Sequence, residues 1–379
     1  MNKNTEPLIK IYRFDQLETL RGLLAWWVVI FHCMAFTGLL NSHSKNPIIT
    51  ILSQGDLAVD GFIILSGIVI TNLIINKNET YSFYIKRRFF RLAPIYFAAL
   101  IVSICLQKLY LTTFQNLSSI TNPGIFAAKI ERVYDFWNNA WQHILLHLTL
   151  LHGILPNQLL NHSATTIMTP AWSISLEWQF YITAPLLIFL IRKKLVYQVL
   201  LVVLCFVLIF IQKKASLDFE GAFFPFQIRL FLIGIYTFMI YQSKENKPVK
   251  VAILLIMITL SLLQKPSVIV PMVLALGFFF IPNMLKQGGR SHAFTHKITS
   301  IPFFKQLGKV SYSTYLFHQA VQLCILFVIT TYFPITNKLY LFVACFITSS
   351  IIVYFLSLIL YKYIEEKGIS IGKKHMLGK

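Results

Sequence analysis

The sequence predicts an all-α protein, a polytopic bundle of transmembrane helices. Apolar residues occupy 56% of the 379 positions and charged residues only 13%, which is about half the charge of a soluble globular domain. Apolar runs of about twenty residues, the length that crosses a bilayer as a helix, recur along the chain. The net charge of +20 comes mainly from basic residues between these runs. That placement is typical of the flanks of transmembrane helices rather than of a nucleic-acid-binding face, so no nucleic-acid partner is expected.

Ten apolar runs predict ten membrane spans. They lie at about 19–40, 57–75, 89–107, 172–191, 195–212, 223–242, 249–263, 267–285, 306–331 and 337–361. A further apolar stretch, 141–155, is short and contains three histidines; it either crosses, re-enters the membrane or lies at its surface. With the N-terminus inside and no crossing there, the cytoplasmic segments collect 22 basic residues and the outer segments 8. This asymmetry favours ten spans with both termini cytoplasmic.

The domain organisation is expected to be simple. Residues 1–379 are interpreted as one transmembrane domain without a fused soluble domain. The longest loop, about 108–171, is long enough to form an outer lid or a platform for an acceptor. The five cysteines are scattered through apolar runs without metal-ligand or redox spacing, so no metal site is expected. The first apolar run lacks a following cleavage pattern and is expected to remain as a membrane anchor.

The first span carries two ionisable residues on one helix face. Arg21 and His32 are eleven residues apart, and eleven steps of about 100° return close to the same face, about 16 Å further along the axis. Arg21 then lies at the cytoplasmic boundary and His32 at mid-membrane or beyond. A snorkelling arginine and a hydrogen-bonded core histidine are the structural alternative. Ionisable residues in a span are costly, and the depth of His32 favours a functional role.

The next two spans carry charge near their ends. Asp56 and Asp60 lie one turn apart near the outer end of the second span, where acidic residues also suit a helix start; a functional role is more plausible for Asp60. Arg87, Arg88 and Arg91 lie at the cytoplasmic end of the third span. Clustered guanidinium groups suit bidentate phosphate contacts, although the positive-inside rule alone also explains basic residues there.

Three later spans also contain polar residues. Glu177, between the interfacial Trp172 and Trp178, lies deeper in the outer half of its span than a belt residue should. Arg229 is a further charge within an apolar run. His318 lies one turn after Tyr315 on the same face, either as a functional group or as a structural hydrogen-bond partner.

Taken together, these segments resemble the acyltransferase 3 family of membrane proteins. The likeness extends over a core of about 14–362. It rests on Arg21 with His32 and, in the same order along the chain, on segments 59–67, 87–96, 172–181, 229–234 and 308–318. One departure is Gly61-Phe62, where the family usually has a bulkier residue after the aspartate. The hydrolase domain that is fused to some members is not expected here, so any onward transfer is expected to need a separate protein.

The resemblance implies a membrane O-acyltransferase in the inner (cytoplasmic) membrane. Its donor would be cytoplasmic acetyl-CoA or another acyl-CoA. Its acceptor would be a hydroxyl of a cell-surface polysaccharide, a lipopolysaccharide or another lipid-linked glycan. The partners expected are therefore acyl-CoA, a carbohydrate and membrane lipid. An ion-coupled transporter of a small metabolite is the alternative function, and a non-catalytic scaffold is a third.

The polar residues receive roles within that implied reaction. His32 is the candidate general base or transient acyl carrier, and Glu177 and Asp60 are expected to orient it or to bind sugar hydroxyls. The candidate donor-binding residues are Arg21, Arg87, Arg88 and Arg91. The candidate acceptor-binding residues are Arg229, Tyr312 and His318, and His318 is also the rival candidate for the base.

Overall fold

The computed structural model describes residues 14–40, 44–77, 79–121, 123–242, 245–284, 301–333, 335 and 337–374. Every regular element in these ranges is a helix, which confirms the all-α prediction. The long helices are α1 (Asp15–Thr37), α3 (Gly55–Asn76), α4 (Tyr81–Cys105), α8 (Ala171–Lys193), α9 (Leu195–Lys214), α10 (Phe224–Gln242), α11 (Lys247–Gln264), α12 (Ile269–Met284), α15 (Ser311–Tyr332) and α16 (Lys338–Leu360). The shorter elements are α2 (Pro47–Leu52), α5 (Gln107–Ile120), α6 (Pro123–Asn138), α7 (Ala140–Leu148), η1 (His152–Ile154), η2 (Pro266–Val268), α14 (Pro302–Lys309), the π-helical turn η4 (Tyr361–Glu365) and α17 (Glu366–Lys374).

Nine helices in the described ranges are long and apolar enough to cross a membrane, and each coincides with a predicted span. The remaining predicted span, 267–285, falls on η2 and α12, and its last residue lies outside the described residues. Its apolar helical part, Pro266–Phe280, is shorter and would cover about 22 Å of a hydrocarbon core about 30 Å thick. The nine-residue α7 is shorter still. The number of spans and the side of each terminus therefore stay predictions, and residues 1–13 and 375–379 lie outside the described part.

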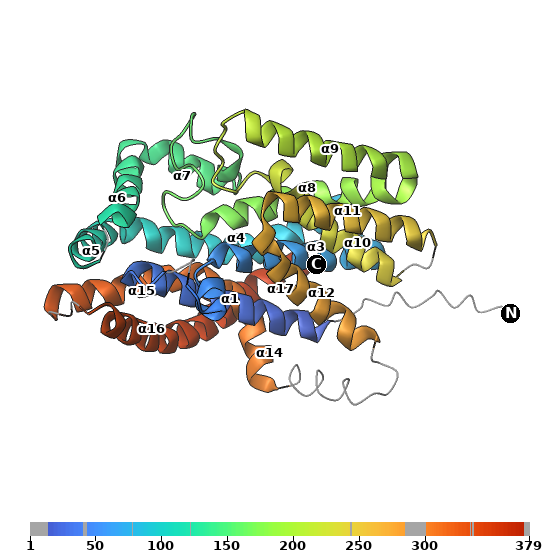
Figure 1. The fold of residues 1–379 in the computed structure, drawn as a ribbon. Coiled ribbons are helices and arrows are strands. Elements are labelled where there is room, and N and C mark those ends of the chain that lie inside the picture. The colour runs from blue at the N-terminus through green and yellow to red at the C-terminus, as the bar shows by residue number, and fades with distance from the viewer. Residues whose placement is uncertain are drawn as a thin grey trace.

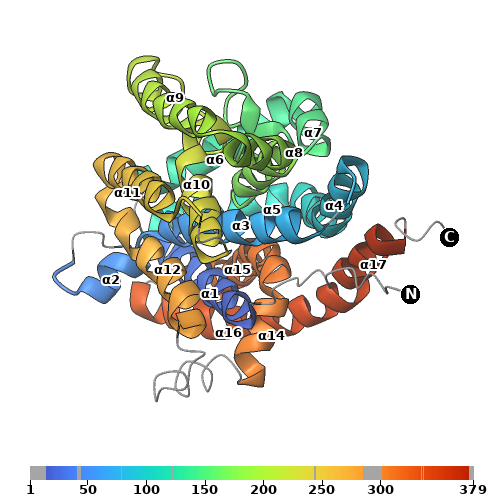
Figure 2. The ribbon, with the colours of Figure 1, turned by 90° about the vertical axis from the view of Figure 1, so that its right-hand side faces the viewer.

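The long helices run side by side along one direction (Figure 1). Viewed along the bundle, α1, α3 and α10 lie inside and α9 and α11 lie at the periphery (Figure 2). This order follows burial, because α10 is mostly buried and α9 mostly exposed. Glycines allow the central helices to touch: a Cβ added to Gly234 would lie 2.1 Å from the carbonyl oxygen of Ile64, and one on Gly67 would lie 2.4 Å from that of Phe231. Small residues at helix crossings permit this backbone approach in membrane bundles.

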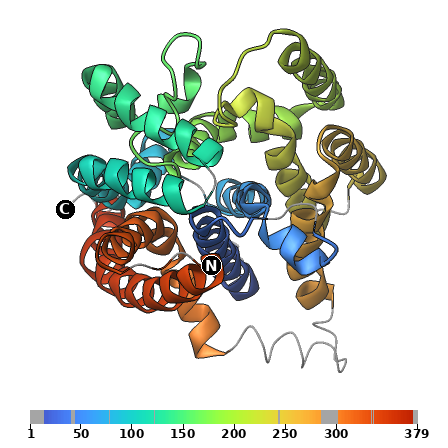
Figure 3. The same cartoon turned by 60° about the vertical axis from the view of Figure 1, so that its left-hand side comes forward.

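The segment expected to be a long loop is largely helical. Figure 1 and Figure 3 show α5, α6 and α7 gathered at one end of the bundle, away from the first described residues of α1. Helix α5 has an apolar stripe of Tyr110, Phe114 and Leu117, which packs in a second core cluster with Phe36 and Phe126. The turn spacing of this stripe is that of an amphipathic helix lying on a bundle. The segment therefore forms a cap over one end of the spans.

The predicted orientation can be checked with single cysteines. In a background lacking the five native cysteines, Gln115→Cys on α5 is expected to react with a membrane-impermeant maleimide in intact cells, because the cap is predicted to lie outside. Lys367→Cys on α17 is expected to react only after permeabilisation. Equal labelling of Lys367→Cys before permeabilisation would contradict a cytoplasmic C-terminal end.

Candidate functional site

A cavity lies among helices α1, α3, α8, α10 and α15. We call it the central cavity; its volume is about 40 Å³. Its polar lining residues are Arg21, Ser66, Ser173, Glu177, Tyr312 and Tyr315, together with Ser311. The residues come from segments up to about 290 positions apart, so the cavity exists only in the assembled bundle.

Glu177 connects the central cavity to the arginine-bearing helix α4. Its Oε1 accepts a hydrogen bond from Ser66 Oγ at 3.1 Å and another from the Tyr181 hydroxyl, and the carboxylate interacts electrostatically with Arg91. From the sequence, Glu177 is predicted on the outer side and Arg21 at the inner boundary. In the structure both residues line one cavity.

The three arginines of α4 have different surroundings. Arg87 forms an ion pair with Glu79. The Arg88 guanidinium is buried, lies 5.8 Å from the centre of the Tyr181 ring, and forms no ion pair with any described residue. Arg91 interacts electrostatically with Tyr181, Glu365 and Glu177. Sequence spacing grouped Arg87 with Arg91, but Arg88 and Arg91 are the members that lie against the Tyr181 and Glu177 side of the bundle.

Two histidines from opposite ends of the sequence lie together. The ring centres of His32 and His318 are 5.0 Å apart. His318 Nδ1 lies 2.7 Å from the Tyr315 carbonyl oxygen. Because a carbonyl can only accept, this nitrogen carries the proton and Nε2 keeps its lone pair in neutral His318. Nε2 of His318 and Nδ1 of His32 are buried and have no hydrogen-bond partner among the described residues.

Asp60 and Arg229 form a separate group. Asp60 Oδ2 accepts a hydrogen bond from Lys265 Nζ at 2.7 Å, and Lys265 also lies 2.6 Å from Asp56. Arg229 donates to the Phe226 carbonyl and interacts electrostatically with Asp60. Neither Asp60 nor Arg229 is among the described residues that line the central cavity. In this arrangement they tie α3 and α10 together, and among the described residues Asp60 makes no hydrogen bond or ion pair with His32.

A second pocket lies beneath the cap, on the other side of the histidine pair. Its charged and amide-bearing lining residues are Gln107, Lys129, Arg132 and Gln319, and Tyr110 and several threonines complete its polar wall. Along α15, Tyr315 lines the central cavity, His318 follows, and Gln319 lines the second pocket. The histidine pair therefore lies between the two spaces. From the sequence, Lys129 and Arg132 are predicted only as charges of an outer loop. The apolar pattern of one helix does not show which helices it will contact.

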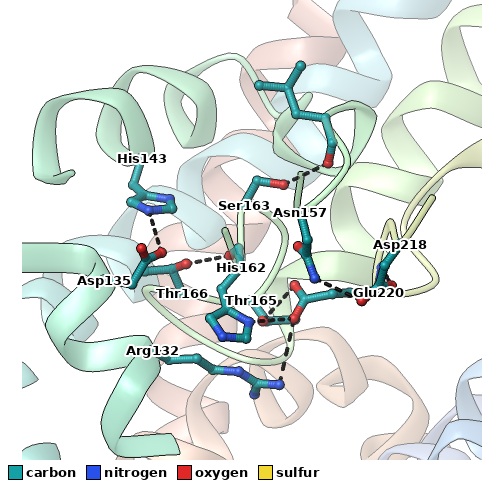
Figure 4. Close-up of polar contacts among 11 residues, drawn as sticks. Arg132, Asp135, His143, Asn157, His162, Ser163, Thr165, Thr166, Asp218 and Glu220 are labelled. Atoms are coloured by element: carbon teal, nitrogen blue, oxygen red, sulfur yellow. Dashed lines mark hydrogen bonds and ion pairs between the residues drawn. The ribbon is translucent and has the colours of Figure 1, made fainter. Parts of the chain in front are cut away.

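The Glu220 carboxylate connects residues next to and lining the second pocket, His162, Thr165 and Arg132, and we call this group the clasp (Figure 4). Glu220 Oε1 lies 2.9 Å from His162 Nδ1, and Oε2 accepts from Thr165 Oγ1 at 2.7 Å. Arg132 Nη2 lies 3.7 Å from the same carboxylate. Although burial alone raises the pKa of the Glu220 carboxyl, the hydrogen bonds from His162 and Thr165 outweigh it and hold that pKa below its usual range. Glu220 is therefore ionised at neutral pH and fixes the wall that carries Thr165.

The cap also contains a buried histidine stack. The rings of His147 and His152 are parallel with centres 4.0 Å apart, and the Tyr96 hydroxyl lies 2.8 Å from His147 Nδ1. Burial lowers the pKa of His152 to about 4, and burial followed by the neighbouring His152 lowers the pKa of His147 well below its usual value. Both rings are neutral at pH 7. Their hydrogen bonds to Tyr96 and to the Ala171 carbonyl make them a structural join between α7, η1 and the bundle.

One buried carboxylate escaped the sequence analysis. Glu365 is 3% exposed and accepts a hydrogen bond from Ser313 Oγ at 3.0 Å. It lies at the π-helical turn η4, beyond the predicted end of the last span at 361. The extra residue in a π-helical turn rotates the following side chains. The apolar pattern of the sequence does not predict such a turn. Glu365 interacts with Arg91 and so belongs to the polar group around the central cavity.

Comparison with known proteins identifies the family of this chain. Residues 14–362 match the acyltransferase domain family Acyl_transf_3. Acyltransferase MdmB of Streptomyces mycarofaciens is 24% identical over 184 residues, which cover 48% of this chain and 41% of that protein. Protein 2 in picA locus of Rhizobium radiobacter is 30% identical over 175 residues, which cover 43% of this chain and 75% of that protein. No solved structure matches the chain. Because the match to the family extends over nearly the whole sequence, the chain belongs to the Acyl_transf_3 family of acyltransferase domains.

Proposed function

We propose that this protein is a membrane O-acyltransferase. It moves an acyl group, acetyl in the simplest case, from cytoplasmic acyl-CoA to a hydroxyl of a cell-surface polysaccharide, a lipopolysaccharide or a lipid-linked sugar, at the inner membrane. The observation that carries this proposal is the His32–His318 pair. Two of its ring nitrogens have no hydrogen-bond partner in the described part of the chain. His318 lies on α15 between Tyr315, which lines the central cavity, and Gln319, which lines the second pocket, in a chain that belongs to an acyltransferase family.

The pair supplies the proton chemistry that acyl transfer needs. A neutral imidazole takes the proton of the acceptor hydroxyl while the hydroxyl oxygen bonds to the carbonyl carbon of the thioester. The carbon–sulfur bond then breaks, and the thiolate leaves as CoA with the proton that the imidazole holds. Acyl-CoA and alcohol thus give ester and CoA-SH. A two-step route through an acyl group on His32 has the same overall balance.

The remaining polar residues divide between the two substrates. Arg88 and Arg91 are suited to the phosphates or the polarised carbonyl of acyl-CoA, and Arg21 reaches the central cavity from α1. Arg87 contributes less in this arrangement because Glu79 already neutralises it. Tyr312, whose hydroxyl donates to the Leu92 carbonyl at 3.3 Å, fixes α15 against α4. Asp60 and Arg229 support the helices that form the wall.

The proposal is tested with purified protein in liposomes. Labelled acetyl-CoA and a glycan extract of the producing cell are expected to give a labelled ester and free CoA. Counterflow of a small metabolite without any acyl-CoA consumption would instead favour the ion-coupled transporter. Mass analysis of surface glycans with and without the gene identifies the acceptor.

Glu177→Gln is expected to reduce transfer to the acceptor while acyl-CoA still binds. The change removes the negative charge that holds the Ser66 and Tyr181 hydroxyls, and a hydrogen bond to a charged group contributes about 1.5–3 kcal/mol. The measurement is the transfer rate beside the acyl-CoA dissociation constant. If acyl-CoA binding weakens in step with transfer, Glu177 belongs to the donor site or to folding. Glu79→Gln, which changes a carboxylate paired with Arg87, is the matched control.

A further inference from the structure

The second pocket contains a positive charge that the described residues do not neutralise. Lys129 Nζ lies 5.2 Å above the centre of the Phe36 ring, and no described carboxylate pairs with it. Arg132 is 3.7 Å from Glu220, a long ion pair, and its Nε is buried without a hydrogen-bond partner among the described residues. Among the described residues, the Glu220 carboxylate, which His162 and Thr165 also engage, is therefore the one carboxylate that pairs with either of these two cations. Burying an uncompensated charge is costly unless a ligand supplies the opposite charge.

The opposite wall of the pocket offers a hydrogen-bond acceptor. Gln107 is 2% exposed, and its Nε2 donates to the carbonyls of Ser103 and Ile167 at 3.0 and 2.9 Å. These two carbonyls fix the amide orientation, since only the NH₂ group can donate to them. Gln107 Oε1 is left buried with no partner in the described part of the chain. An acceptor in this position calls for a donor, and an alcohol hydroxyl is the donor that also suits the proposed reaction.

The pocket lies next to the histidine pair. The Phe36 ring that Lys129 covers is 5.8 Å, centre to centre, from the His32 ring. Lys129 and Arg132 both act electrostatically on His32. Gln319, which follows His318 in α15, lines the pocket and donates to Thr169 Oγ1 at 3.3 Å. A sugar ring held here by a charged substituent would place a neighbouring hydroxyl towards the imidazoles.

We propose that the second pocket binds the acceptor through a negatively charged, hydroxyl-bearing sugar unit, with Lys129 and Arg132 on its anionic group and Gln107 Oε1 on a hydroxyl. The inference rests on the proposed acyltransferase function for the identity of its ligand as the acceptor. The anionic group is a carboxylate, as in a sugar acid, or a phosphate, as in a sugar phosphate; both offer acceptor oxygens to the two cations. A neutral sugar satisfies Gln107 but leaves Lys129 without a counter-charge.

The chemical reactivity of the Lys129 amine can be used to measure whether a ligand occupies the second pocket. Burial, with a further contribution from the neighbouring Arg132, lowers the pKa of the Lys129 ammonium to about 8. At pH 8 about half of this amine is therefore neutral and nucleophilic, so an amine-reactive acetylating reagent modifies it, and peptide mass spectrometry reads the extent. Three probes share one sugar ring and differ in the group at C6: methyl glucuronide carries a carboxylate, methyl glucoside 6-phosphate a phosphate, and methyl glucoside an uncharged hydroxymethyl.

One or both charged probes are expected to protect Lys129 in the full-length protein, and the neutral probe is not. Protection by the glucuronide alone identifies a sugar acid, and protection by the phosphate alone identifies a sugar phosphate. Arg132→Gln is expected to raise the half-protecting concentration of the charged probe about tenfold or more, the loss typical of a charged hydrogen bond. Lys108→Gln removes an exposed charge of the same cap outside the pocket and is expected to change nothing.

Equal protection by all three probes, protection by none, or protection by CoA instead would overturn the inference. Acyl-CoA binding by the Arg132→Gln protein confirms that the variant is folded. Protection needs no turnover, so a protein that is protected by a charged probe but transfers no acyl group would refute the proposed function and leave the anion site standing.

Discussion

His32→Ala is expected to lower the rate of acyl transfer about a hundred- to ten-thousand-fold, the range typical of a lost general base. The substitution removes the α1 member of the imidazole pair, whose ring centre is 5.0 Å from that of His318. Expression, folding and acyl-CoA binding are expected to stay near normal, because the His32 ring forms no hydrogen bond to the backbone of any described residue. The measurement is acyl transfer at matched protein level, with acyl-CoA affinity measured beside it.

His318→Ala is the control for this assignment. His318 Nδ1 is held by the Tyr315 carbonyl, so its free Nε2 has a fixed direction and makes it the rival base. If the His32 variant keeps more than about a tenth of the wild-type rate, which is less than the loss expected for a base, His32 is not the base and His318 takes that role. If the two act as a unit, the double variant is no slower than the slower single variant, since residues of one catalytic unit are strongly non-additive.

Arg88→Ala is expected to weaken acyl-CoA binding by about 1.5–3 kcal/mol, the contribution of a hydrogen bond to a charged group. This loss corresponds to an increase of about tenfold to 150-fold in the dissociation constant. The reason is its environment: the guanidinium is buried against Tyr181 with no ion-pair partner among the described residues, so donor phosphates would be its counter-charge. Acyl-CoA titration of the purified variant measures the effect.

Arg87→Ala is the matched control on the neighbouring position. Glu79 already pairs with Arg87, so a smaller change in acyl-CoA affinity is expected there. Unchanged affinity in a folded variant with Arg87, Arg88 and Arg91 all replaced by alanine would exclude the cluster from the donor site. A larger effect at Arg87 than at Arg88 would place the donor phosphates at the Glu79 end of α4.

Several parts of the candidate site could be found from sequence because membrane burial makes them conspicuous. A charge or an imidazole within an apolar run is costly, and this rule alone selected Arg21, His32, Glu177 and His318. Helical periodicity placed Arg21 and His32 on one face of α1. Neither rule gives the partner of a residue. Asp60 is a predicted site residue, and only the structure shows that its carboxylate lies 2.7 Å from Lys265.

The structure of the cap could not be predicted from the sequence. Its helices are short and amphipathic, so none has an apolar run long enough to be recognised as a membrane span. Lys129 and Arg132 reach the second pocket only because α5 and α6 pack on the Phe36 end of α1. The clasp between Glu220 and His162 joins loops 58 residues apart, and such pairings leave no local pattern.

The sequence by itself determined the all-helical membrane architecture, nearly all of its long spans and the polar residues that a bilayer would not tolerate without a reason. Those properties depend on hydropathy and on the 3.6-residue period, which are local. The tertiary structure alone decided which polar residues meet: His32 with His318, Arg21 with Glu177, and Lys129 with Arg132 beneath the cap. These meetings depend on how helices far apart in the chain cross, and the crossings are set by close contacts such as Gly67 against Gly234, whose energy is realised only when both helices are in place.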